Sequence, residues 1–66
     1  MKVIVNGETG EYVEGITLAT LINELGIKVK VMAAAVNMEV VKKDDWTSHV
    51  VQEDDKIELL HFVGGG

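Results

Sequence analysis

The 66-residue sequence lacks cysteine, proline and arginine, so its basic residues are six lysines and two histidines. Without cysteine it can form neither disulfides nor cysteine-ligated zinc or iron–sulfur sites, and packing alone must stabilise so short a domain. No run approaches the roughly 18 apolar residues of a membrane span, and the N-terminal apolar run is too short for a signal peptide. We therefore expect a soluble, cytoplasmic protein that does not bind membranes.

The charge balance is acidic. Eleven aspartates and glutamates outnumber the lysines and give a formal net charge of −5. Because nucleic-acid binding depends on basic residues that neutralise phosphates, we expect no nucleic-acid partner. The excess acid either keeps a small protein soluble or steers it toward a basic surface on a protein partner.

Several strands are predicted from β-branched and apolar runs. Residues 2–6 end in an Asn-Gly pair, a hairpin signal, and residues 9–13 would return as the second strand. Residues 31–36 and 40–41 are predicted as two further strands. The apolar residues 57–63 are predicted as a long final strand that suits the centre of a sheet.

One main helix is predicted between the second and third strands. Its apolar residues recur at i, i+3, i+4 and i+7 and share one face, namely Leu18, Leu21, Ile22 and Leu25. Thr17 is placed to cap the N-terminus, and Gly26 to end the helix in a left-handed conformation. The order of elements predicts an α+β fold, a mixed sheet with this helix packed across one face.

No set of side chains in the sequence predicts an active site. Ser48 and His49 are adjacent, so their side chains diverge on a helix or a strand. His49 and Glu53 could share a helix face, but with no third ligand evident they are at most a weak metal pair. His61 is interpreted as a partly buried or interface residue. We expect no catalytic residue, no metal site and no bound cofactor.

Three glycines, Gly64, Gly65 and Gly66, follow the last predicted strand. The chain therefore divides into a domain at residues 1–63 and a flexible tail at residues 64–66. The tail is either a frayed end or a functional one. Extended, it would reach roughly 10 Å, and without Cβ atoms it could thread a narrow tunnel.

The carboxylate of Gly66 is the group that such a tail would present, and it is ionised at neutral pH. It could attack the α-phosphate of ATP inside a partner enzyme and form an acyl adenylate. A sulfur donor could then displace AMP and leave a thiocarboxylate. Because the chain has no cysteine to carry a persulfide, the carbonyl carbon of Gly66 is the natural attachment point for sulfur.

The sequence resembles the sulfur carrier proteins of thiamine-thiazole biosynthesis, which are ubiquitin-like β-grasp proteins. The resemblance covers the whole chain and rests on KVIVNGE, EGITLATLINELGI, VNMEVV, the Trp46 region, the acidic turn before IELLHFV, and the terminal GGG. Within it, Gly65 and Gly66 match the terminal Gly-Gly motif, and Phe62 and Val63 match the hydrophobic approach to it. Two departures are Met38, which follows Asn37 where the family often has glycine, and Lys42-Lys43, where Pro-Arg is common.

The resemblance implies a non-enzymatic carrier. An adenylating enzyme of the ubiquitin-activating type would consume ATP to activate Gly66, and thiazole synthase would take the sulfur from the thiocarboxylate. The free carrier is expected to be a monomer. The small subunit of molybdopterin synthase shares this chemistry and remains an alternative, although those chains are usually longer and carry proline near the tail. An interaction module or a conjugated modifier is a third possibility.

The alternation of the last strand predicts a partner-binding surface. Ile57, Leu59 and His61 share one side, while Glu58, Leu60 and Phe62 share the other. If the helix covers the first set, Leu60 and Phe62, together with Val63, form an exposed apolar patch beside the tail. The competing interpretation is that a second layer or a loop covers them.

Overall fold

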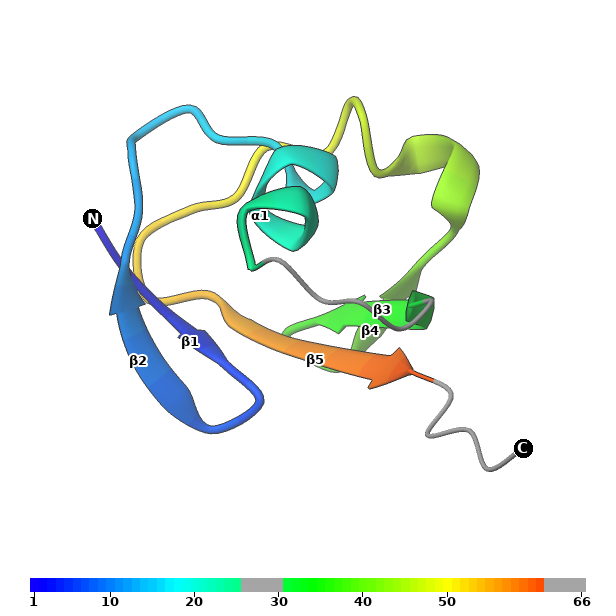
Figure 1. Cartoon of the computed structure of the whole chain (residues 1–66), viewed down its shortest axis with the longest axis horizontal. Helices are drawn as coiled ribbons and strands as arrows, with labels where there is room; N and C mark the ends of the chain where they lie inside the picture. The colour runs from blue at the N-terminus through cyan, green and yellow to red at the C-terminus, as the bar shows by residue number, and fades with distance from the viewer. Residues whose placement is uncertain (26–30, 62–66) are drawn as a thin grey trace.

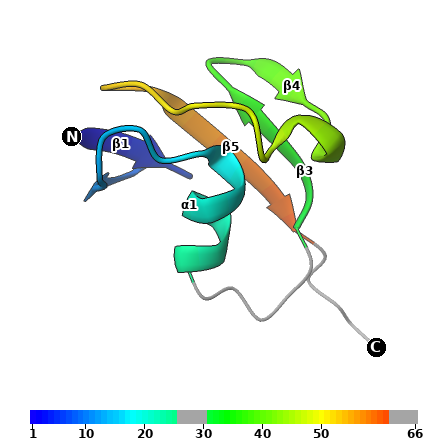
Figure 2. The same cartoon turned by 90° about the horizontal axis from the view of Figure 1, so that it is seen from above.

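The computed structural model describes residues 1–25 and 31–61, apart from the side chain of His61, and contains one five-stranded mixed sheet in this part of the chain. The strands are β1 (Lys2–Val5), β2 (Glu8–Glu11), β3 (Val31–Val36), β4 (Glu39–Val41) and β5 (Lys56–His61), in the spatial order β2-β1-β5-β3-β4. β5 is central, parallel to β1 and antiparallel to β3. Helix α1 (Leu18–Glu24) lies across one face (Figure 1, Figure 2), which confirms the predicted α+β architecture.

The two hairpins of the sheet have closely similar turns. Asn6 and Gly7 join β1 to β2 with φ values of 49° and 83°, and Asn37 and Met38 join β3 to β4 with values of 51° and 71°. Two successive positive φ angles are the conformation that matches the twist of a two-residue hairpin. Asn37 and Met38 therefore both lie in the left-handed region of backbone conformation.

The second strand is shorter than predicted, because residues 9–13 were expected to be extended and the strand ends at Glu11. Its partner β1 begins at Lys2, which pairs with Glu11. Beyond Glu11, the Tyr12 N–H donates to the Met1 carbonyl at 2.9 Å, outside the paired strands. Within β2, Gly10 pairs directly with Val3. A Cβ at Gly10 would lie 2.9 Å from the Tyr12 ring, so any other residue there would displace the tyrosine side chain.

Helix α1 begins as predicted. The Thr17 hydroxyl accepts a hydrogen bond from the Thr20 N–H at 3.2 Å, which satisfies one of the free donors of the first turn. Leu18 and Leu21 are fully buried, and Ile22 and Leu25 pack partly against the core. The predicted helix end at Gly26 lies outside the described residues. In the described part of the chain, no helix has the length and apolar character needed to span a membrane.

The segment after β4 ties the helix to the sheet. A short 3₁₀ helix, η1 (Lys43–Asp45), follows β4, and the Trp46 indole donates to the Val41 carbonyl at 2.9 Å. The Leu18 N–H donates to the His49 carbonyl at 2.9 Å, and the Val51 N–H donates to the Ile16 carbonyl at 2.9 Å. Trp46 and Val51 are thereby held in the core between helix and sheet.

The acidic turn before β5 contains a buried carboxylate that the sequence did not distinguish from its neighbours. Asp55 is 8% exposed, and its oxygens accept hydrogen bonds from the Asn37 side-chain amide at 2.9 Å and the Gln52 N–H at 2.8 Å. The Asn37 carbonyl oxygen in turn accepts from the Lys56 N–H at 3.0 Å. This network fixes the start of β5 against the β3–β4 turn.

Replacing Asp55 with alanine should lower the free energy of unfolding by about 1–3 kcal/mol, because the Gln52 N–H and the Asn37 amide lose their acceptor. Urea denaturation followed by tryptophan fluorescence would measure the change. Asp44→Ala is the matched control, since Asp44 is exposed and should change stability little. Equal effects of the two substitutions would contradict a structural role for Asp55.

Candidate functional site

The central strand β5 leads directly toward the predicted glycine tail. Its early part is fixed by β1, where the Asn6 N–H donates to the Ile57 carbonyl at 2.8 Å. Beyond the end of β1, the side chain of Asn6 continues the hydrogen bonding to β5, because its amide oxygen accepts from the Leu59 N–H at 2.8 Å. The strand is therefore held on the β1 side as far as Leu59. The predicted site residues Phe62, Val63, Gly64, Gly65 and Gly66 lie outside the described residues.

The side chains of β5 alternate as predicted. Ile57 and Leu59 are 1% and 7% exposed and face the helix, whereas Leu60 is 64% exposed on the opposite side. Glu58 is also exposed. The predicted exposure of Leu60 is confirmed.

Leu60 belongs to a larger apolar surface, which we call the outer face, on the side of the sheet opposite α1. The register between neighbouring strands determines which residues lie on the outer face. Ala33 pairs with Leu60, and Ala35 pairs with both Glu58 and Val40. Directly paired residues present their side chains on the same face. The apolar members of the outer face are Ile4, Ala33, Ala35, Val40 and Leu60.

The small side chains of Ala33 and Ala35 make the outer face concave. Both alanines line a hollow of about 380 Å³, together with Val40 and Leu60 among others. Val40 is 75% exposed. Such a hollow can accept apolar side chains from a partner protein. The alternation of the last strand predicted the exposure of Leu60 but not the positions of Val40 and the two alanines, because cross-strand register cannot be derived from alternation within one strand.

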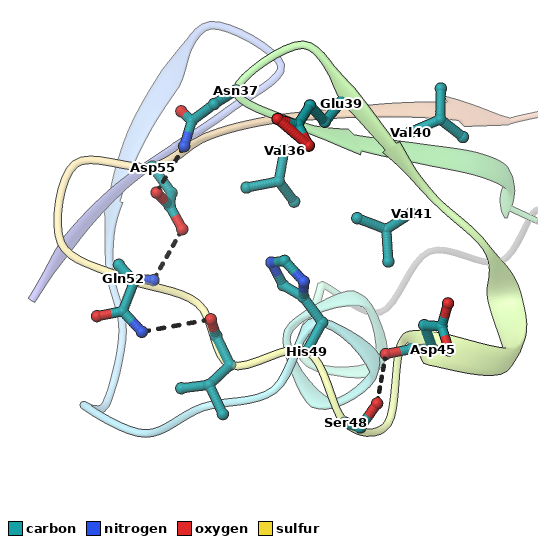
Figure 3. Close-up of a pocket in the computed structure, with 11 residues that line it drawn as sticks. Val36, Asn37, Glu39, Val40, Val41, Asp45, Ser48, His49, Gln52 and Asp55 are labelled. Carbon is teal, nitrogen blue, oxygen red and sulfur yellow. Dashed lines mark hydrogen bonds between the residues drawn. The ribbon is translucent and has the colours of Figure 1, made fainter.

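A second concavity lies between the β3–β4 turn and residues 48–55, with a volume of about 590 Å³. Figure 3 shows the His49 ring pointing into it. The Ser48 hydroxyl donates to the Asp45 carbonyl at 3.2 Å, and His49 and Glu53 do not share a helix. Among the residues described, no group of three potential ligands could hold a metal ion. In this pocket the Ser48 hydroxyl is thus directed to a backbone carbonyl.

The central β5 and the covering helix α1 agree with the mixed sheet and main helix that the sequence predicted. A family model described as the ThiS family matches residues 3–66. The chain belongs to the ThiS family. This match confirms the resemblance drawn from the sequence motifs.

Known members support both the family and the fold. The crystal structure of the thiamine biosynthesis protein ThiS from Geobacter metallireducens is similar with a TM-score of 0.82 and 26% identity, covering 100% of both chains. The chain is 29% identical to the sulfur carrier protein ThiS of Escherichia coli, again over the full length of both. The β-grasp fold predicted from the resemblance is thereby confirmed.

Other relatives are much longer. The thiazole synthase of Magnetococcus marinus is 41% identical to the chain over all 66 residues. The chain spans 20% of the length of the thiazole synthases that it matches. A unit like this ThiS-family domain is therefore part of those polypeptides.

Proposed function

We propose that this chain is a sulfur carrier of thiamine-thiazole biosynthesis and that it is not itself an enzyme. The observation that carries the proposal is the ThiS-family match, which extends through the glycine run to Gly66. Full-length similarity to a protein named as a sulfur carrier supports it. The working group is the carboxylate of Gly66, at the end of a tail formed by Gly64 to Gly66, and the carrier acts in the cytoplasm.

The carrier chemistry takes place in two steps inside partner enzymes. A carboxylate oxygen of Gly66 attacks the α-phosphate of ATP, which forms an acyl adenylate and releases pyrophosphate. A hydrosulfide equivalent then attacks the carbonyl carbon, a C–S bond forms, and AMP leaves as the C–O bond breaks. The product is a thiocarboxylate, whose sulfur is the cargo.

The chain's contribution is to present this acyl group rather than to catalyse. Glycine residues at positions 64–66 offer no side chains that would obstruct a narrow active-site channel, and they accept backbone conformations closed to other residues. The β-grasp domain, residues 1–63, acts as the monomeric handle that partners recognise. Neither a metal nor a cofactor is bound to the carrier in this scheme, since ATP is consumed by the adenylating enzyme.

Two partners follow from this scheme, an adenylating enzyme of the ubiquitin-activating type and a thiazole synthase. The similarity to thiazole synthases supports the second partner. Leu60 lies on the strand that leads to the tail and is exposed, so the outer face beside it is the natural docking surface. Phe62 and Val63 continue the same chain toward Gly66 and are proposed to contact the partners as well.

Incubation with an adenylating enzyme, ATP and a sulfur donor should replace one oxygen of the chain by sulfur at the C-terminus. Intact mass spectrometry, with fragmentation to place the change at Gly66, would measure it. A protein modifier would instead give a heavier, isopeptide-linked product. Sulfur loading that supports molybdopterin synthesis but not thiazole formation would favour the molybdopterin synthase alternative.

Leu60→Asp should weaken binding to thiazole synthase by about tenfold or more, because a charge would be buried in an apolar contact. The free energy of unfolding should change little, since Leu60 is 64% exposed. Isothermal titration calorimetry and urea denaturation would measure the two quantities. Val13→Asp is the matched control, because Val13 is 73% exposed but lies outside the outer face. Equal loss of binding in both variants would contradict docking through the outer face.

A further inference from the structure

Met38 occupies a backbone conformation that its side chain disfavours. Its φ of 71° lies in the left-handed region, where an L-residue with a Cβ is strained. The other hairpin of the same sheet has glycine at the equivalent position, since Gly7 follows Asn6 as Met38 follows Asn37. The same type of turn is therefore relaxed at Asn6-Gly7, where glycine accepts a positive φ, and strained at Asn37-Met38.

Burial does not compensate for this strain. Met38 is 89% exposed, so its side chain gains little from packing within the folded chain. Strained residues that folding does not require are often held for function. A flexible, polarizable methionine side chain on a surface is suited to pack against a partner.

The position of Met38 links it to the outer face. With Ile4, Gly7, Lys56 and Glu58 it lines a hollow of about 420 Å³. Glu58 also borders the hollow that Ala33 and Leu60 line. The two hollows are therefore neighbours along β5, and Lys56 and Leu60 are separated by about 13 Å at the rise of an extended strand.

We propose that Met38 is the distal anchor of the docking surface for thiazole synthase. This inference rests on the proposed function and extends its footprint from Leu60, near the tail, to the far end of the outer face. A partner that receives the acyl group of Gly66 must cover the Leu60 end, and from there the same side of the sheet extends past the exposed, charged side chains of Glu58 and Lys56 to Met38. Apolar side chains of the synthase fill the two hollows on either side of Glu58.

The alternative occupant of this face, a second copy of the chain, is less favoured on charge. Each copy has a net charge of −5, so two copies repel one another. The 66-residue unit is matched within thiazole synthases, which supports a synthase surface as the occupant.

Met38→Gly tests the proposal because its two expected effects have opposite signs. The substitution should raise Tm by about 4–8 °C, since it relieves the left-handed strain. It should also weaken binding of the full-length chain to thiazole synthase by about tenfold, because the apolar anchor is lost. Thermal unfolding and isothermal titration calorimetry measure the two effects on one protein sample.

Two control variants separate the effect of the Met38 side chain on affinity from other effects of substitution. Met38→Leu keeps an apolar anchor and the strain, so its Tm and its affinity should stay close to the original values. Val13→Gly removes an exposed apolar side chain outside the outer face and should leave affinity unchanged. Native affinity in Met38→Gly, or a lower Tm, would overturn the inference. A third outcome is that the original chain forms a dimer, that Met38→Gly dissociates this dimer, and that synthase binding is unaffected. This outcome would assign the outer face to a second copy of the chain and would also overturn the inference.

The same samples separate this inference from the proposed function. If the original chain is loaded with sulfur and Met38→Gly binds the synthase normally, only the role of Met38 fails. If the original chain is neither loaded nor bound, the proposed function fails and the inference fails with it.

Discussion

Deletion of Gly66 is expected to abolish sulfur delivery while leaving the fold intact. The shortened chain would end in the carboxylate of Gly65, about 3.3–3.6 Å short of the position that the full tail reaches. A displacement of even 1 Å at a reacting centre can reduce a rate by about a hundredfold. The loss of thiocarboxylate formation should therefore be at least of that order, measured by intact mass after incubation with the adenylating enzyme, ATP and a sulfur donor.

Controls for this deletion lie within the tail itself. Gly66→Ala keeps the length and the carboxylate but adds one methyl group, so loading should fall less than in the deletion. Both variants should unfold at the same urea concentration as the original chain, because they do not alter the packed domain. A deletion variant that still supplies sulfur for thiazole formation would refute the proposed role of Gly66.

Leu21→Ala should destabilise the domain by about 2–5 kcal/mol, the largest effect on stability that we expect from one substitution. Leu21 is fully buried between α1 and the sheet, and alanine would leave a cavity there. A domain of this size has a total stability on the order of 3–10 kcal/mol. The variant should therefore be partly unfolded well below the melting temperature of the original chain, as circular dichroism during a thermal scan would show.

A leucine-to-alanine substitution on the outer face is the control for the same substitution in the core. Leu60→Ala removes the same atoms from a side chain that is 64% exposed, so it should change stability by no more than about 0.5 kcal/mol. The contrast between the two leucines tests which face of the sheet α1 covers. Similar destabilisation by both substitutions would mean that Leu60 is part of the core.

Local patterns in the sequence were sufficient to predict helix α1, the strands and their order along the chain, but not the short helix η1. The helix followed from the i, i+3, i+4, i+7 spacing and from Thr17, whose hydroxyl cap is local by nature. The strand boundaries were less accurate, as at Glu11, because a strand ends where its neighbour ends. The side-chain alternation of β5 placed Leu60 on the outside for the same local reason that it placed Leu59 inside.

Asp55 and Met38 show what the sequence left open. Asp55 stood among three consecutive acidic residues, and only the approach of Asn37 and Gln52 made it a buried acceptor. Met38 was visible as a departure from glycine, but its strain and its exposure depend on the backbone of the folded hairpin.

The sequence by itself therefore determined the fold class, the helix, the order of the strands along the chain and the glycine run of the proposed carrier group. These features depend on residues close together in the chain, whose periodicity and turn chemistry can be read directly. Only the tertiary structure decided the outer face, since Ala33, Val40 and Leu60 come from three strands. Their juxtaposition depends on hydrogen-bonded register across the sheet, which no local pattern contains.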